Sequence, residues 1–148
     1  MRIVLAAESE GVASELGDLF SEIDGVLVRS GAVGEVAADC DAILMKFYLA
    51  HDRYGGSPVV GESQVLTNSR GDGLPGRVVA TSPFPSSDTS TDDSEVERRL
   101  RSMFARAFDA VRTAEGIGED WRVLVHREGL GLDAFSAQQI FDAIRASR

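Results

Sequence analysis

The chain has 148 residues, and its hydrophobic share of 43% and charged share of 26% are typical of a folded soluble protein. The formal net charge is -9, and the fifteen basic residues are fourteen arginines and Lys46. Because nucleic-acid affinity depends on basic side chains that displace counterions, this charge argues against a nucleic-acid partner. The length predicts one domain that spans residues 1–148.

The composition also bears on location and on cofactors. Cys40 is the only cysteine, no apolar run is long enough to cross a bilayer, and residues 1–11 lack the pattern of a signal peptide. We therefore expect a cytoplasmic protein without a membrane partner. The chain has no P-loop or GxGxxG motif, and its two histidines and one cysteine show no metal-ligand spacing. The sequence thus predicts neither a cofactor nor a metal site.

Strand and helix patterns alternate in the first third of the chain. RIVLAA at residues 2–7 is a continuous apolar run, which is typical of a strand that is covered on both faces. Ser9 is a candidate N-cap for a helix whose apolar residues follow at helical spacing. Further strands are predicted at residues 25–30 and 41–45, with a glycine-containing turn between them.

The second half of the chain continues this alternation. Residues 62–68 and 77–84 are candidate strands on either side of a turn that contains several glycines. The clearest amphipathic helix covers residues 94–115 and carries five arginines on its polar face. A strand at 121–126, a glycine loop and a helix capped by Ser136 complete the chain.

This order of elements predicts an α/β fold, a three-layer α/β/α sandwich with a mixed, mostly parallel central sheet. In such folds functional groups gather at the carboxyl ends of the strands. The alternative is a flavodoxin-like or receiver-like fold. A receiver needs an acidic pair directly after its first strand, and this chain has only Glu8 and Glu10 there.

Two segments that follow predicted strands hold the candidate ligand-binding residues. Gly129 and Gly131 lie between a strand and a helix, where glycines let the backbone approach a ligand and helix N–H groups can hold a diphosphate. Lys46, Tyr48 and His51 follow the strand at 41–45 in what reads as a short reactive turn. His126 is either a proton carrier or, as we favour, a packed residue at a strand end.

Read in order, the whole chain resembles a macro domain, the α/β/α fold that binds ADP-ribose and related ADP-ribosyl groups. Four segments carry the resemblance: DAI at 41–43, GESQVLTNSRGDGLPGRVVATSP at 61–83, the long helix at 94–115, and the strand, glycine loop and helix at 121–145. The resemblance implies that residues 62–68 and 77–84 are paired strands. It also implies a ligand site at Gly129 and Gly131, with one side supplied by Lys46, Tyr48 and His51.

The chain departs from the macro pattern where that family contacts its ligand. LMKFYLAHDRYGG stands where family members have an asparagine and a run of glycines, so that Tyr48 occupies about the place of the asparagine. Ala32 replaces the aspartate that usually contacts adenine. Because hydrolysis needs groups held in precise working geometry, we expect little or no ADP-ribosyl hydrolase activity and assign no catalytic residue.

Three functions remain open from the sequence. The first is a non-catalytic module that binds ADP-ribose or a related nucleotide-like anion. The second is a degenerate macro-like domain with a closed pocket that contacts a protein partner, through the arginine face of the helix at 94–115. The third and weakest is an enzyme, of ADP-ribosyl hydrolase type or with new chemistry at Lys46, His51 and Asp52.

Overall fold

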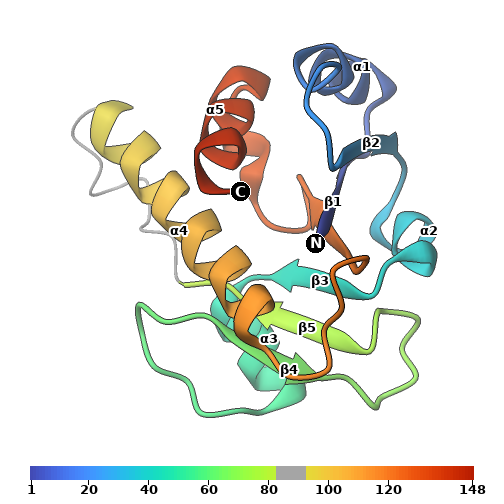
Figure 1. Ribbon diagram of the computed structural model, residues 1–148, viewed down its shortest axis with the longest axis vertical. Coiled ribbons are helices and arrows are strands. Elements are labelled where there is room, and N and C mark those ends of the chain that lie inside the picture. The colour runs from blue at the N-terminus through green and yellow to red at the C-terminus, as the bar shows by residue number, and fades with distance from the viewer. Residues whose placement is uncertain (83–92) are drawn as a thin grey trace.

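The computed structural model describes residues 1–82 and 93–148, which form a six-stranded sheet with helices on both faces (Figure 1). The strand order is β2-β1-β6-β3-β5-β4, and only β4 runs antiparallel to its neighbour. The predicted α/β fold with a mixed, mostly parallel sheet is confirmed. The strands are β1 (Arg2–Ala7), β2 (Val26–Ser30), β3 (Ala42–Met45), β4 (Gln64–Thr67), β5 (Arg77–Ala80) and β6 (Arg122–His126).

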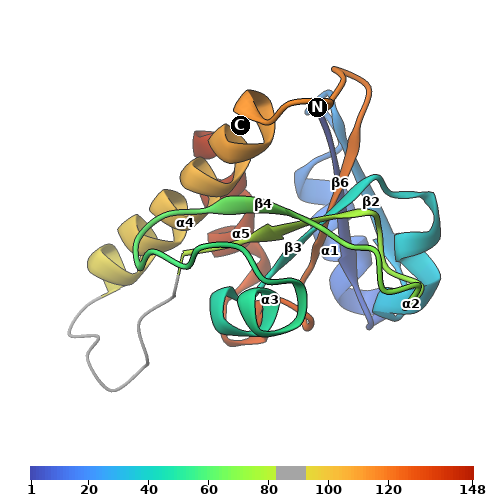
Figure 2. The same ribbon diagram turned by 90° about the horizontal axis from the view of Figure 1, so that it is seen from below.

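The helices form the two outer layers. One layer consists of α1, α4 and α5, and the other consists of α2 and α3, which lie on the opposite side of the sheet in Figure 2. The helices are α1 (Glu10–Leu19), α2 (Val33–Val36), α3 (Phe47–Tyr54), α4 (Asp93–Thr113) and α5 (Ala137–Ser147), with short 3-10 turns at Ala37–Asp39 and Leu132–Ala134. Among the residues described, no helix is both long and apolar enough to cross a bilayer.

The continuous apolar runs of the central strands have a simple physical cause. Successive side chains of a strand point to opposite faces, so Ile3 and Leu5 pack with α1, α4 and α5, whereas Val4 and Ala6 pack on the α2 and α3 side. Both faces are covered, and the side chains of β1 after Arg2 are therefore buried throughout.

The segment after β3 differs from the prediction. It is not an irregular reactive turn but the helix α3, which begins at Phe47, directly after Lys46. Phe47 and Ala50 are spaced three residues apart and are both buried, and Ala50 belongs to the core cluster on this face of the sheet, which favours a helix here. Gly55 ends it with a φ of 81°.

Two further segments differ from the prediction, one in its type of structure and one in its end point. Between β2 and β3 the expected glycine turn is replaced by α2 and a 3-10 turn, because Val36 and Ala37 are buried under the sheet. The strand expected at 77–84 ends at Ala80. Residues 83 and 84 of that prediction lie outside the described residues.

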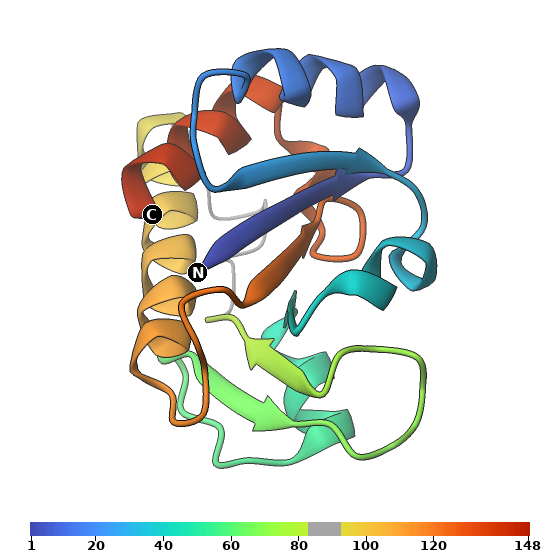
Figure 3. The same ribbon diagram turned by 45° about the vertical axis from the view of Figure 1, so that its right-hand side comes forward.

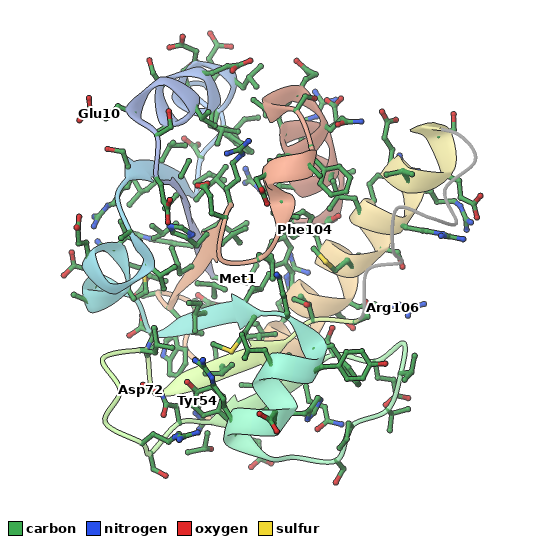
Figure 4. The ribbon with its side chains drawn as sticks, turned by 180° about the vertical axis from the view of Figure 1, so that it is seen from behind. Met1, Glu10, Tyr54, Asp72, Phe104 and Arg106 are labelled. Carbon is green, nitrogen blue, oxygen red and sulfur yellow. The ribbon has the colours of Figure 1, made fainter. Side chains whose placement is uncertain are left out.

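A polar cluster fixes the turn between β4 and β5, and Tyr54 points toward Asp72 there (Figure 4). The Asp72 carboxylate accepts hydrogen bonds from Tyr54 Oη at 2.5 Å, Asn68 Nδ2 at 2.9 Å and the Leu74 N–H at 3.1 Å. These donors, Tyr54 first, lower the pKa of Asp72 to about 2. Burial and the bond to Asp72 raise the pKa of Tyr54.

Candidate functional site

The candidate site lies at the carboxyl ends of the neighbouring strands β3 and β6, where the chain continues to opposite faces of the sheet. β3 is hydrogen-bonded to β6 on one side and to β5 on the other. After β3 the chain passes to α3 on one face of the sheet, and after β6 it passes to α5 on the other. Ligands of open α/β sheets bind at such topological switch points. The predicted site residues all follow these two strands.

On the β3 side, the site is formed by Lys46 and the first turn of α3. Lys46 is the N-cap residue of α3, and its side chain makes no capping hydrogen bond. The first intrahelical bond runs from the Ala50 N–H to the Lys46 carbonyl at 2.9 Å. The three amides before Ala50 therefore have no acceptor within the helix. Such amides, together with the helix dipole, favour an anion.

On the β6 side, Gly131 lies directly against Lys46. Gly131 has a φ of 75°, a left-handed conformation that favours glycine. A Cβ built on Gly131 would lie 2.9 Å from Lys46 Cε and 3.4 Å from Lys46 Nζ. A side chain there would displace the lysine, so glycine at this position lets the two loops meet.

The loop after β6 uses its own backbone amides. The N–H of Gly129 donates to His126 Nδ1 at 2.9 Å, and that of Leu130 donates to the His126 carbonyl at 2.9 Å. The next two amides, of Gly131 and Leu132, donate to carbonyls of residues 128 and 127 at 3.1 Å and 2.7 Å. This loop is thus internally hydrogen-bonded, and the free helix amides of the site belong to α3.

His126 holds this loop in place. Its ring is only 1% exposed, and its two nitrogens contact Gly31 and Gly129. Because the Gly129 N–H can only donate, Nδ1 must be the acceptor, and Nε2 then carries the hydrogen that is donated to the Gly31 carbonyl at 2.9 Å. Of the two interpretations from the sequence, the geometry favours the packed residue at a strand end.

Tyr48 and His51 lie in different parts of α3. Tyr48 is in the first turn, 70% exposed, and its ring contacts Phe47 edge-on at 5.1 Å. His51 lies further along, with Nδ1 2.7 Å from the Gly55 carbonyl, and its Nε2 is buried without a hydrogen-bond partner among the residues described. The structure therefore brings Lys46 and Gly131 together, and Tyr48 follows Lys46 by two residues in the first turn of α3. His51 lies toward the other end of the helix.

The charges around the site leave Lys46 as its available cation. Arg127 is paired with Glu128, Nη1 to Oε2, at 3.3 Å, and Glu128 Oε1 also accepts the Glu8 N–H at 2.7 Å. Lys46 forms no ion pair within residues 1–82 and 93–148. In the same part of the chain, no group of three or more His, Cys, Asp or Glu side chains is placed to hold a metal ion.

Sequence reasoning identified Lys46 and Gly131 but missed two features of the site. The first is the uncapped start of α3, which the spacing of Phe47 and Ala50 followed by a glycine could have revealed. The second is the pairing of Arg127 with Glu128, which no spacing rule predicts because the two residues are adjacent.

The fold and the site define the chain as an α/β protein with a lysine, an uncapped helix start and a left-handed glycine at a topological switch point. No protein-family model matches the chain, and no curated protein matches it.

Proposed function

We propose that the chain is a divergent macro-like module that binds ADP-ribose or a related nucleotide-like anion at the carboxyl ends of β3 and β6. The observation that carries the proposal is the contact of Lys46 with Gly131, 2.9 Å from Cε to a Cβ built on the glycine. Lys46, which has no ion-pair partner among the described residues, thus lies where the segments that follow β3 and β6 meet before they continue to opposite faces of the sheet.

The groups around Lys46 suit the parts of such a ligand. The uncapped amides of α3 and the ammonium of Lys46 are donors for phosphate oxygens. Tyr48 exposes 70% of its surface in the first turn of the same helix and offers an aromatic face for a base. The anion would thus contact the α3 side of the site, and the loop after β6 would limit the space opposite it.

The same geometry supports binding over catalysis. Both nitrogens of His126 are engaged with Gly31 and Gly129, so this buried ring is not available as a base. The asparagine and glycine run of the macro pattern are absent from residues 46–56. We therefore expect little or no ADP-ribosyl hydrolase activity.

The protein-contact alternative has weaker support. Arg98 exposes 68% of its side chain on α4, which is the observation in its favour. However, Arg98 and Arg99 lie 3.7 Å and 2.7 Å from Glu95, and Arg106 donates to the Gly61 carbonyl. Much of the arginine face is thus engaged within the chain.

Calorimetry with ADP-ribose tests the binding proposal. We expect Lys46→Ala to weaken binding about tenfold or more, because it removes the cation of the site. Gly131→Ala should weaken it as well, since the new methyl group displaces the lysine. Gly73→Ala is the matched control, because Gly73 has a similar φ of 82° but no atom within 4 Å of a Cβ built there.

Two results would contradict the proposal. The first is the absence of heat at millimolar ADP-ribose with the wild-type protein. The second is equal binding by wild type and Lys46→Ala, which would place any ligand elsewhere on the molecule. Release of ADP-ribose from a modified protein by the wild-type chain would overturn the expectation of low hydrolase activity separately from binding.

A further inference from the structure

β4 is the last strand of the sheet, and in the part of the chain that is described no further strand pairs with its outer edge, although the segment from α3 to β4 runs alongside it (Figure 3). The Asn68 N–H donates to the Gly76 carbonyl at 2.9 Å, so Asn68 and Gly76 form a hydrogen-bonded pair. Hydrogen-bonded and non-hydrogen-bonded pairs alternate along β4 and β5 from this pair onward. Leu66 and Gln64 therefore turn their backbone groups toward β5, whereas Val65 and Thr67 turn theirs outward. No backbone hydrogen bond from the described residues reaches these outward groups.

Apart from its short length of four residues, β4 lacks the charges and prolines that usually prevent edge strands from pairing. Its four residues, QVLT, include no charge and no proline, and Val65 and Thr67 are β-branched. Two adjoining hollows of about 510 and 490 Å³ lie on the α4 side of the sheet, where they are lined by residues 61–65, Arg77 and the last part of α4 with the residues that follow it. A further strand at the outer edge thus has backbone groups to pair with.

We propose that β4 pairs with β4 of a second copy of this chain, antiparallel about a twofold axis at Leu66. The direction of the outward groups limits the register, because Val65 and Thr67 are the residues that must exchange hydrogen bonds across the new interface. In this register Val65 lies opposite Thr67 of the second copy, and the two Leu66 residues face each other. The two sheets become one continuous sheet.

Charge selects this register over its neighbours. It places Glu62 opposite Arg70 of the second copy at both ends of the interface. Both residues flank β4 and are exposed, and neither forms an ion pair within the part of the chain that is described, where Arg70 Nη1 donates to the Arg53 carbonyl at 3.2 Å. If the second copy moved along β4 so that Glu62 lay opposite Asn68, the pair would be neutral. If it moved the other way, Glu62 would lie opposite Asp72, and the two carboxylates would repel each other.

Sedimentation equilibrium of the full chain over a range of concentrations tests the proposal. We expect a dimer, and Glu62→Arg or Arg70→Glu alone should weaken it about tenfold or more, since each sets like charges against each other. The double variant Glu62→Arg with Arg70→Glu should restore dimerisation to near the wild-type level. Glu22→Arg, an equal charge change at an exposed residue that follows α1, should have no effect.

A second variant tests the backbone pairing itself. Thr67→Pro removes an outward N–H but none of the bonds to β5, and proline is tolerated at such edge positions. We expect a folded monomer, with the circular dichroism of the wild type. A wild-type protein that is monomeric at every concentration would overturn the proposal, as would a dimer that persists in Thr67→Pro or that the charge exchange fails to restore.

Discussion

Replacing His126 by alanine should destabilise the fold strongly, although His126 is one of only two histidines and lies next to the candidate site. The ring is 1% exposed and bridges Gly31, after β2, to Gly129, after β6. The variant loses both hydrogen bonds, at about 0.5–1.5 kcal/mol each because water reaches the half-exposed glycines. It also leaves a space where the ring was, at about 1–2 kcal/mol. The expected loss is about 2–5 kcal/mol of unfolding free energy.

Urea unfolding measures this loss, with Trp121 fluorescence as the probe, because Trp121 is the only tryptophan and packs against the main core. His126→Asn keeps an acceptor near Nδ1, and His126→Gln keeps a donor near Nε2, so each should recover part of the loss. His51→Ala is the control, since it removes one hydrogen bond at the end of α3 and should cost about 1 kcal/mol or less.

Two outcomes would refute the reasoning about His126. One is a loss in His126→Ala no larger than that in His51→Ala, because the bridge between two loops would then contribute nothing. The other is a pair of asparagine and glutamine variants that are no more stable than alanine. In that case burial of the ring, and not its two directed hydrogen bonds, would carry the stability.

Two further predictions concern the turn between β4 and β5 and the loop after α3. The pKa of Asp72 is lowered to about 2 in the folded chain, so its carboxylate stabilises the fold above its ordinary pKa of about 4, and this is lost as the pH falls toward 2. The stability gap between wild type and Asp72→Asn should therefore close over this range in urea titrations, and a constant gap would contradict it. Gly56→Ala should cost about 1–3 kcal/mol more than Gly71→Ala, because both have positive φ but only a Cβ on Gly56 meets a neighbour, Leu66 Cδ2 at 2.5 Å. Equal thermal stability of the two variants would show that the loop moves aside freely.

The parts of the fold that the sequence predicted are those with strong local patterns. The apolar run of β1 and the capping serine of α5 each determine their element within a few residues, so both could be read from the chain alone. The helix α3 was missed because it has only eight residues and its buried side is formed by few side chains, Phe47 and Ala50. A short amphipathic pattern is hard to distinguish from a turn.

The candidate site was predicted only as two separate groups of residues. Lys46 and Gly131 are 85 positions apart, and they meet because β6, the last strand in the chain, lies between β1 and β3. Strand order depends on how the helices pack on both faces and not on any local pattern. The sequence therefore indicated candidate residues but could not show which of them are neighbours.

The hydrogen bonds of the two loops assign different roles to the two sides of the site. The sequence suggested that a diphosphate would lie over Gly129 and Gly131 and be held by N–H groups at the start of the following helix. The amides of residues 129–131 instead donate to acceptors within the segment 126–128, and Ser136 and Gln139 form a capping box at the start of α5. These loop amides could donate to a phosphate only if their existing hydrogen bonds broke, including the one from Gly129 to the buried His126 ring. The first-turn amides of α3 have no such competitor within the helix, and Lys46 precedes them directly. The physical chemistry therefore moves the expected anion contact from the glycine loop to α3, with Gly131 acting through the space that it leaves for the lysine.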